Sequence, residues 1–365
     1  MSDPEARPRL GRRRFPLLVL GLVSACAVLG GVVYWGTGDE APKREHCDGY
    51  LTDDNLTRLL GEGANDADPT WTSYADTTGR SHQTKKKERG DISRCALSLP
   101  NGDVGEFVTS TALEPGPYQP VSQGVVWYED SAPLGSALPG WTEPGRSVVM
   151  LPEECTEKFS AQGKPVQVTF RAMRAYWGDV LDPDRRVLAE ALVSYASTMA
   201  ELKGCGGDDL RLTGEVPEVP APEPLPDGGH CGLSGFAATR PQEDGPSLEQ
   251  TVVGDPSDSW SCVVGLELAG EESLVPAAFA VTSHREFIDQ YDSAAHADQE
   301  DATVEVLACA DQEYLLVMAF AAPDPEESVE EERQRQELAE SRLKPKEELY
   351  GDFVAAARKS LGCPA

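Results

Sequence analysis

Eight of the nine cysteines form two series of four that repeat the same local surroundings. Each series opens with a His-Cys pair and closes with a Gly-Cys pair after an amphipathic stretch. The members are Cys47, Cys95, Cys155 and Cys205, then Cys231, Cys262, Cys309 and Cys363. Such a repeat indicates an internal duplication, and paired cysteines in even number persist mainly in oxidising compartments. The pattern predicts two related, disulfide-braced domains outside the cytoplasm.

The pairing of these cysteines is only partly determined by the sequence. Eight cysteines allow 105 pairings, of which three remain if each half pairs internally and both halves pair alike. A glycine after a helix turns the chain back toward the surface on which the helix packs, so the last cysteine of each half can reach the third. We favour Cys47–Cys95, Cys155–Cys205, Cys231–Cys262 and Cys309–Cys363. The other two arrangements stay open.

The segment from Phe15 to Trp35 is a long run without a charged residue. At 1.5 Å rise per residue, a helix of this length spans about 30 Å, the thickness of a bilayer core. Arg12, Arg13 and Arg14 precede it, and positive charge stays on the cytoplasmic side. We expect a single-pass membrane protein with a cytoplasmic tail at 1–14, a transmembrane helix at 15–35 and the remaining residues outside.

Two other processing routes stay open at Cys26. The sequence Val23-Ser24-Ala25-Cys26 resembles a bacterial lipobox, which would make Cys26 the lipidated first residue of the mature protein. Ala25-Cys26-Ala27 has the small-x-small form of a signal-peptidase site. The apolar run continues to Val33, which favours an uncleaved anchor. All three routes place the domains outside the cytoplasmic membrane.

The net charge restricts the class of partner. The chain carries −30, and residues 1–14 hold five arginines against two acidic residues, so the remainder carries −33. Nucleic-acid binding needs a basic face, so nucleic acid is excluded as a general partner. Solubility is the simplest explanation of the acidity.

Composition divides the chain after the membrane segment. We expect a tether at 36–45, a first domain at 46–205, a proline-rich linker at 206–229 and a second domain at 230–363. The spacing of prolines from Pro217 to Pro226 favours an extended spacer that folds into neither neighbour. The predicted fold class is α+β, with two tandem related domains, each an antiparallel sheet with packed helices.

Local patterns predict the elements of each domain. In the first, Thr52 can cap a helix that ends at Gly61, and Asp182 can cap a final helix at 183–203. Strands are expected at 92–99, 106–113, 124–128, 147–151 and 165–173. In the second, strands are expected at 260–268, 275–282, 303–308 and 314–322, with helices at 286–291 and 345–361. The acidic stretch 324–344 is predicted to be a solvated helix with ion pairs such as Glu331–Arg335.

The sequence offers few candidates for chemistry. No Walker loop, G-x-S-x-G elbow or H-E-x-x-H helix occurs, and the one S-x-x-K, Ser341 to Lys344, falls in the charged stretch, where chance is the simplest explanation. His46 and His230 each adjoin a cysteine, which suggests a metal site, but cysteine pairs in exported proteins are more often disulfides. We therefore expect no metal and no cofactor.

One basic cluster lies outside the predicted membrane segment: Lys85, Lys86, Lys87 and Arg89. It falls in a polar loop of the first domain that is shorter in the second. A solvated loop is the simplest interpretation, and contact with an anionic cell-wall polymer is the functional one.

The segment Cys47–Leu60, followed by Gly61 and by Cys95 at a strand, resembles small exported domains of actinobacterial lipoproteins. The whole chain resembles single-pass actinobacterial, streptomycete-like membrane proteins with duplicated four-cysteine extracytoplasmic domains. The resemblance implies an α+β fold and an envelope location, and it transfers no catalytic residue.

Together these features favour a non-enzymatic role at the cell membrane: binding or sensing, or support of an envelope assembly, with a wall polymer or an envelope protein as partner. A cell-wall hydrolase and a purely structural spacer stay open, because sequence cannot show whether polar side chains converge. Recognition is expected through the first domain.

Overall fold

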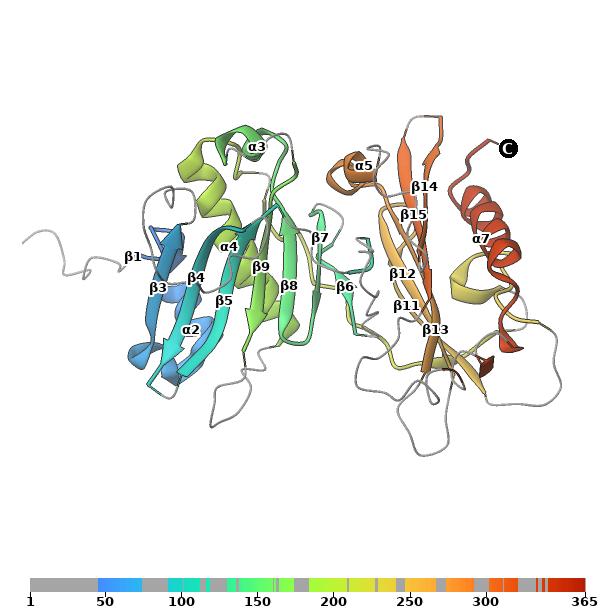
Figure 1. Cartoon of the computed structure of the whole chain (residues 1–365), viewed down its shortest axis with the longest axis horizontal. Coiled ribbons are helices and arrows are strands. Elements are labelled where there is room, and N and C mark those ends of the chain that lie inside the picture. The colour runs from blue at the N-terminus through green and yellow to red at the C-terminus, as the bar shows by residue number, and fades with distance from the viewer. Residues whose placement is uncertain are drawn as a thin grey trace, which may run out of the picture. The chain divides into compact units, whose positions relative to one another are not determined.

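Figure 1 shows the computed structural model of the chain. It describes residues 45–73, 91–100, 102–111, 116–118, 130–135, 138–159, 161, 164–173, 184–208, 210–226, 229–240, 247–266, 274–291, 302–310, 312–320, 333, 337–338 and 341–364. The described residues belong to one unit, Glu45–Ala365. The predicted membrane segment, the basic cluster and the expected strand at 124–128 lie outside them. Among the described residues, no helix is both long and apolar enough to cross a membrane.

The described part of the chain is α+β with two antiparallel sheets, which confirms the predicted fold class at that level. The first sheet has the strand order β3-β4-β5-β9-β8-β7-β6. Its strands are β3 (Asp68–Ser73), β4 (Asp91–Leu99), β5 (Gly102–Ser110), β6 (Ala132–Pro133), β7 (Gly140–Glu143), β8 (Arg146–Met150) and β9 (Gln167–Ala172). A separate hairpin pairs β1 (Glu45–His46) with β2 (Leu51–Thr52).

The second sheet has the order β10-β11-β12-β13-β15-β14. Its strands are β10 (Glu223–Pro224), β11 (Leu248–Asp255), β12 (Ser259–Leu266), β13 (Leu274–Thr282), β14 (Ala302–Ala308) and β15 (Glu313–Phe320). Five strands follow the same order in both sheets, since β3-β4-β5-β9-β8 corresponds to β11-β12-β13-β15-β14. A shared strand order is the outcome that the repeated cysteines predicted.

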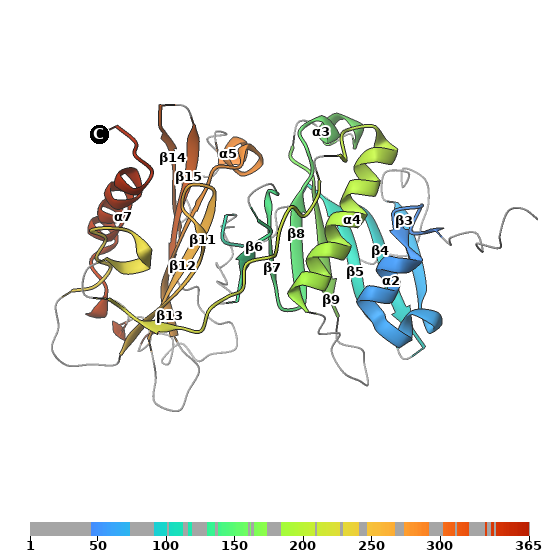
Figure 2. The same cartoon turned by 180° about the vertical axis from the view of Figure 1, so that it is seen from behind.

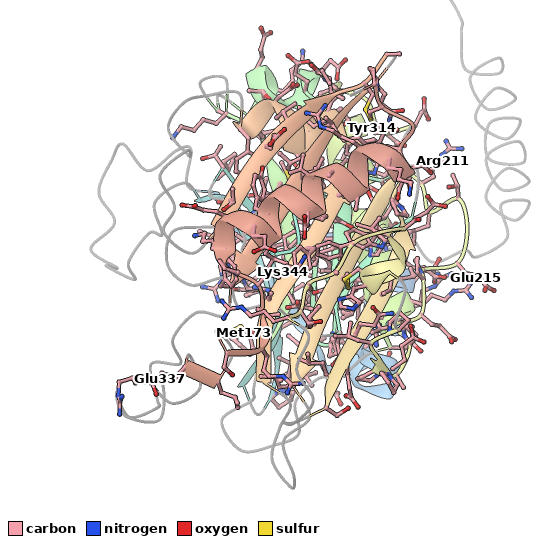
Figure 3. The ribbon with its side chains drawn as sticks, turned by 90° about the vertical axis from the view of Figure 1, so that its right-hand side faces the viewer. Met173, Arg211, Glu215, Tyr314, Glu337 and Lys344 are labelled. Atoms are coloured by element: carbon pink, nitrogen blue, oxygen red, sulfur yellow. A yellow bond between two sulfur atoms is a disulfide. The ribbon has the colours of Figure 1, made fainter. Side chains whose placement is uncertain are left out.

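Helices pack against both sheets, and in the second half they lie on both faces, because Phe353 packs with Phe279 whereas Phe287 and Ile288 pack with Ala278, the next residue along the strand. In the first half these are α2 (Asp53–Leu60) with the 3-10 turn η1 (Gly61–Asp66), α3 (Glu154–Lys158) and α4 (Arg185–Lys203). Figure 2 shows α2 and α4 lying across the first sheet. The second half has η2 (His230–Gly232), α5 (Arg285–Tyr291) and α7 (Lys346–Ser360). Figure 3 shows α7 crossing the second sheet, with Lys344, which pairs with Asp352 of the helix, labelled.

The inner faces of the two sheets carry matching rows of side chains. Cys95 of β4 lies opposite Phe107 of β5, and Cys262 of β12 lies opposite Phe279 of β13. Tyr195 of α4 stacks on Phe107 with ring centroids 4.3 Å apart. In the second half the ring of Phe353 in α7 lies 5.1 Å from Phe279. Tyr195 and Phe353 each precede the last cysteine of their half by the same number of residues.

The four disulfides have the pairing that the sequence favoured: Cys47–Cys95, Cys155–Cys205, Cys231–Cys262 and Cys309–Cys363. Gly204 and Gly362 adopt the left-handed conformation after α4 and α7, with φ of 65° and 68°. The next residue then donates its N–H back into the helix, from Cys205 to Ala200 and from Cys363 to Arg358. This turn brings each final cysteine to a Cα distance of 4.9 Å from its partner.

A third cluster of buried apolar residues has members from both halves. The first half contributes Tyr118, Trp141, Val148 and Met150. The second half contributes Phe287 and Ile288 of α5 and the outer-face residues Val263, Ala278, Ala280, Leu315, Val317 and Ala319. The rings of Tyr118 and Phe287 lie 5.3 Å apart. A Cβ at Gly116 would come within 2.3 Å of the Trp141 ring, so only glycine fits there.

Several details differ from the expectation. β3 and β11 were not expected. The final helix of the first half is capped by Asp184, whose Oδ1 accepts the N–H of Arg186 at 2.7 Å, instead of by Asp182, which lies outside the described residues. The linker also folds with its neighbours: Leu210 is buried in the first core, and Glu223–Pro224 pairs with β11. A spacer that joins neither half is therefore wrong, because the prolines leave Leu210 and Glu223 able to pack and pair.

Candidate functional site

Neighbouring strands of the first sheet present charged side chains at opposed positions on one face. Glu106 of β5 lies opposite Arg171 of β9, which lies opposite Arg146 of β8, which lies opposite Glu143 of β7. Phe170, the neighbour of Arg171 along β9, is buried in the core on the helix side. Because successive side chains of a strand point to opposite faces, the charges lie on the face away from α2 and α4.

The carboxylates of this row hold the arginines. Glu106 forms a close ion pair with Arg94 Nε from β4, and its Oε1 lies 3.7 Å from an Nη of Arg171. Glu143 accepts a hydrogen bond from Arg146 Nε at 2.5 Å. The Glu106 side chain is 10 % exposed, whereas those of Arg94 and Arg171 are 28 % and 32 % exposed. We call these five residues the charged row. Its acids are buried, and two of its guanidinium groups reach solvent.

The charge of the row is opposite to that of the chain. Three arginines and two glutamates give the charged row one net positive charge on a protein whose formal charge is −30. Arginine presents a planar fork of donors that matches the oxygens of carboxylates and phosphates. The row is therefore a place on an acidic protein at which an anionic group can be held.

Two buried donors lie beside the row on the same face. The next line of the register runs from Arg94 through Val108, Thr169 and Val148 to Trp141. Thr169 is 1 % exposed and Trp141 is fully buried. Neither Thr169 Oγ1 nor Trp141 Nε1 has a hydrogen-bond partner in the described structure. A buried donor without a partner costs about 1–3 kcal/mol, so both invite an explanation.

The second sheet lacks this site. Aligning the two sheets on Cys95 and Cys262 through the strand register gives the equivalent of each position. Ser261 replaces Arg94, Ala278 replaces Glu106, Val317 replaces Thr169, Ala319 replaces Arg171 and Ala302 replaces Arg146. Ala278, Val317 and Ala319 belong to the apolar cluster shared by the halves. These positions are therefore charged or polar in the first half and small or apolar in the second, although Trp141, Val148 and Met150 on the same face of the first sheet also belong to the shared apolar cluster.

The residues that the sequence singled out lie at separate places, and some of them lie outside the described part of the chain. The eight paired cysteines all lie in disulfides, while Lys85, Lys86, Lys87 and Arg89 lie outside the described residues. His46 Nε2 lies 2.8 Å from Asp53 Oδ1. His230 Nδ1 accepts the N–H of Ala238 at 2.8 Å, and burial lowers its pKa. Within the described ranges, no group of three or more His, Cys, Asp or Glu residues could hold a metal ion.

A histidine, an acid and a hydroxyl come together at one end of the second sheet. His284 Nε2 lies 3.9 Å from Asp258 Oδ1, and Ser259 Oγ lies 3.1 Å from Thr282 Oγ1. The His284 ring packs edge-on against Phe287. Its Nε2 is buried without a hydrogen-bond partner in the described part of the chain, so it does not act as a base on Ser259 in this arrangement. Burial lowers the pKa of His284 to about 4 and raises that of Asp258.

His284 should make the fold sensitive to acid. Its folded pKa, about 4, lies below the value near 6.5 of an unfolded chain, so its contribution is complete above pH 6.5 and is lost as pH falls toward 4. The loss is on the order of 3 kcal/mol by linkage. Burial raises the pKa values of Asp258 and Glu286, so their protonation opposes this loss as the pH falls. Urea unfolding of wild type and His284→Gln between pH 7 and 4 checks this. The variant should lose less stability, and parallel curves would contradict the assignment.

The sequence did not point to the charged row. Its members come from β4, β5, β7, β8 and β9, and only the register brings them together. Arg94, Glu106 and Arg171 fall in predicted strands, where a charged residue is ordinary for a solvated face, and Glu143 and Arg146 fall outside every predicted strand. No family model, curated protein or solved structure matches the chain.

Proposed function

We propose that this protein is a membrane-anchored, extracytoplasmic binding protein that contacts an anionic partner through the outer face of its first sheet. The observation that carries the proposal is the charged row, which has no counterpart at the equivalent positions of the second sheet. The four disulfides support an oxidising location, and the uncharged segment 15–35 supports the anchor. Protease added to intact protoplasts should remove both halves. Protection of both halves from the protease would contradict the proposed location.

Recognition through the first half has a physical reason. A partner with negative charge is repelled by most of a chain that carries −30, so it is tolerated only where the local field is reversed. The charged row provides that reversal on the described surface. The basic residues Lys85, Lys86, Lys87 and Arg89 would add to it, because their loop joins β3 to β4 of the same sheet. An anionic cell-wall polymer or an acidic envelope protein has the required chemistry.

The second half supplies the variant that tests this proposal. Replacing Arg94 with Ser and Glu106, Arg146 and Arg171 with Ala installs residues that the equivalent positions of the second sheet already carry. The full-length protein, solubilised in detergent, is passed over purified cell-wall polymer at low salt. The swap should reduce retention at least tenfold, because a few desolvated charged contacts dominate such binding.

The chain also offers a matched control. Arg58 and Arg186 flank Glu190 on the helical side of the first half, at 2.8 Å and 3.0 Å. This second Arg-Glu-Arg group is removed as Arg58→Ser, Glu190→Ala and Arg186→Ala, and retention should stay unchanged. Replacing Lys85, Lys86, Lys87 and Arg89 with Gln should weaken retention further, mainly at low ionic strength. Equal retention of the wild type and the four-residue swap would refute recognition through this face.

A further inference from the structure

We infer that the edge of the second sheet at β14 is a docking surface for a basic partner protein, which adds an extended segment to the sheet as a further strand. The inference goes beyond the proposed function, because it concerns the other sheet and a partner of the opposite charge. It follows from three observations: how the other sheet edges are protected, which strands the first sheet has beyond the equivalent position, and the charge of the chain.

The sheet edges are the first observation. Within the described residues the two sheets have four edge strands: β3, β6, β10 and β14. β3 contains Pro69, while β6 and β10 are two residues each and end in Pro133 and Pro224. Proline and short length keep an edge from pairing with another chain, because a bare edge presents a row of unpaired N–H and C=O groups. β14 has seven residues and contains neither proline nor lysine.

The β14 edge is also regular. Its residues pair with β15 from Ala302, opposite Ala319, to Ala308, opposite Glu313, without a shift of register. No bulge therefore turns the strand away from a newcomer. Alternate backbone groups of an antiparallel strand point away from its neighbour, and no strand in the described part of the chain pairs with those of β14. Of the four edges, β14 is the one best able to accept another strand.

The first sheet shows the equivalent position filled. β8 corresponds to β14, and it pairs on its far side with β7, which pairs with β6. β7 has the sequence Gly-Trp-Thr-Glu and directly precedes β8 in the chain. The residues before β14, 292–301, contain no Val, Ile, Thr, Phe, Tyr or Trp, which are the residues that favour strands. The second half thus keeps the accepting strand, but the sequence before it does not favour a strand of the kind that fills this position in the first half.

The side chains of β14 indicate the pattern of a fitting segment. Val304 and Val306 pack against the cluster shared by the two halves, on the outer face. Glu305 lies between them on the inner face, where it accepts hydrogen bonds from Tyr350 Oη at 3.0 Å and from Arg358 at 3.4 Å. Its side chain is 35 % exposed. Residues opposite each other in neighbouring strands share a face, so the segment should alternate apolar residues with basic ones.

Charge selects a basic partner over a second copy. The chain carries −30, and the segments that flank the β14-β15 hairpin, 292–301 and 321–332, contain four and six acidic residues and no Lys or Arg. Because the two strands are antiparallel, both segments join the hairpin at the same end. Such a charge attracts cations and repels another copy of this chain. Antiparallel pairing of two copies about the centre of β14 would also place Glu305 opposite its own counterpart, which is destabilising.

The test uses a short synthetic peptide in which valine alternates with lysine. It is titrated into the full-length protein, solubilised in detergent at low salt, and binding is followed by fluorescence anisotropy. The peptide should bind. N-methylation of its backbone should weaken binding roughly tenfold or more, because strand addition depends on main-chain hydrogen bonds. Replacing its lysines with glutamates should weaken binding by about as much, because the acidic protein repels that peptide.

Two proline variants examine the edge itself. Neighbouring residues of β14 point their N–H groups alternately toward β15 and away from it. Of Thr303→Pro and Val304→Pro, one therefore removes an outward N–H and the other breaks the pairing with β15. Thermal unfolding identifies the more stable variant, and this variant should bind the peptide roughly tenfold more weakly than wild type. Leu202→Ala, at an exposed residue of the first half, should bind like wild type.

Hydrogen exchange gives a readout that needs no variant. Peptide binding should slow exchange at the outward-facing amides of β14 by about tenfold or more, because their N–H groups become hydrogen-bonded. If these amides are already as protected as those of β13 in the protein without peptide, the edge is covered and the inference fails. Sedimentation then distinguishes cover by a second copy from cover by the chain itself.

The remaining outcomes are equally decisive. Absence of binding by the wild type, equal binding of the N-methylated peptide, or equal binding by the folded proline variant overturns docking at β14. Equal binding of the lysine and glutamate peptides overturns the basic class of partner. Retention on cell-wall polymer is measured with substitutions in the first sheet alone, so failure of the proposed function leaves this inference standing, and its own failure leaves the proposed function standing.

Discussion

Replacing Phe353 with alanine should lower the free energy of unfolding by about 3–5 kcal/mol. Phe353 is fully buried, and its ring lies 5.1 Å from Phe279, 5.9 Å from Phe236 and 6.3 Å from Trp260. The Phe353 ring packs α7 against the inner face of the second sheet. Its loss removes buried apolar surface and leaves a cavity that these rings can only partly fill.

The equivalent residue of the first half gives the opposite expectation. Tyr195 stacks on Phe107, but its hydroxyl is buried without a partner in the described structure, and burial raises its pKa well above 10. Tyr195→Phe copies the residue of the second half and removes an unpaired polar group, so it should be neutral or stabilise by up to about 1 kcal/mol.

Urea unfolding followed by tryptophan fluorescence measures both variants. Leu202→Ala is the control, since Leu202 is 63 % exposed and should contribute little. A loss below about 1 kcal/mol for Phe353→Ala would mean that α7 is not packed as described.

The sequence was a good guide wherever the relevant signal was local. Gly204-Cys205 and Gly362-Cys363 correctly predicted two helix ends and two disulfides. A glycine in the left-handed conformation ends a helix and reverses the chain within one turn, so the signal is local. Thr52 was correctly identified as a cap, and its Oγ1 accepts the N–H of Asn55. The matching order of cysteines agrees with the matching order of strands, since Cys95 and Cys262 lie in the equivalent strands β4 and β12, and Cys205 and Cys363 follow the final helices α4 and α7.

It was a poor guide wherever the fold depends on register. β3 contains Pro69, and β11 has a polar end with Gly254, so neither has the alternation of a half-buried strand. The charged row is invisible in sequence because Glu106 and Arg171 are distant in the chain and meet only through the pairing of β5 with β9. The apolar residues of β13 and β15 likewise predict strands, but they do not show that Ala278, Ala280 and Ala319 pack in the cluster shared by the two halves.

The prediction of a separate linker was wrong for a different reason. Proline spacing correctly indicates extended backbone, yet extended backbone is also what an edge strand needs. Glu223–Pro224 pairs with β11, and Gln250 of β11 donates to Glu223 at 2.8 Å while accepting the N–H of Cys231 at 2.6 Å. A proline is compatible with such an edge, where its missing N–H need not face a partner strand.

Removing the disulfide Cys309–Cys363 by the double change to serine should cost about 4 kcal/mol on the chain-entropy model. The bond closes a loop of 54 residues in sequence separation and ties the end of α7 to the residue after β14. Without it, the unfolded chain gains freedom and the last turn of the helix loses its attachment. Removing Cys155–Cys205, with a separation of 50, should cost a similar amount because the term grows only slowly with loop length.

Equilibrium unfolding in urea, with and without reductant, gives these values, and peptide mapping without reduction gives the pairing. Cys26→Ser is the control, because Cys26 lies in the predicted membrane segment, outside both four-cysteine series, and its removal should leave the unfolding of the disulfide-braced halves unchanged. If the two halves are repeats of one unit, the two C-terminal disulfides should have matching effects on the helices that they anchor, α4 and α7. A bridge between residues before 206 and residues after 229, or a loss below about 1 kcal/mol from either double variant, would contradict this account. The shared strand order would then be the remaining evidence for an internal duplication.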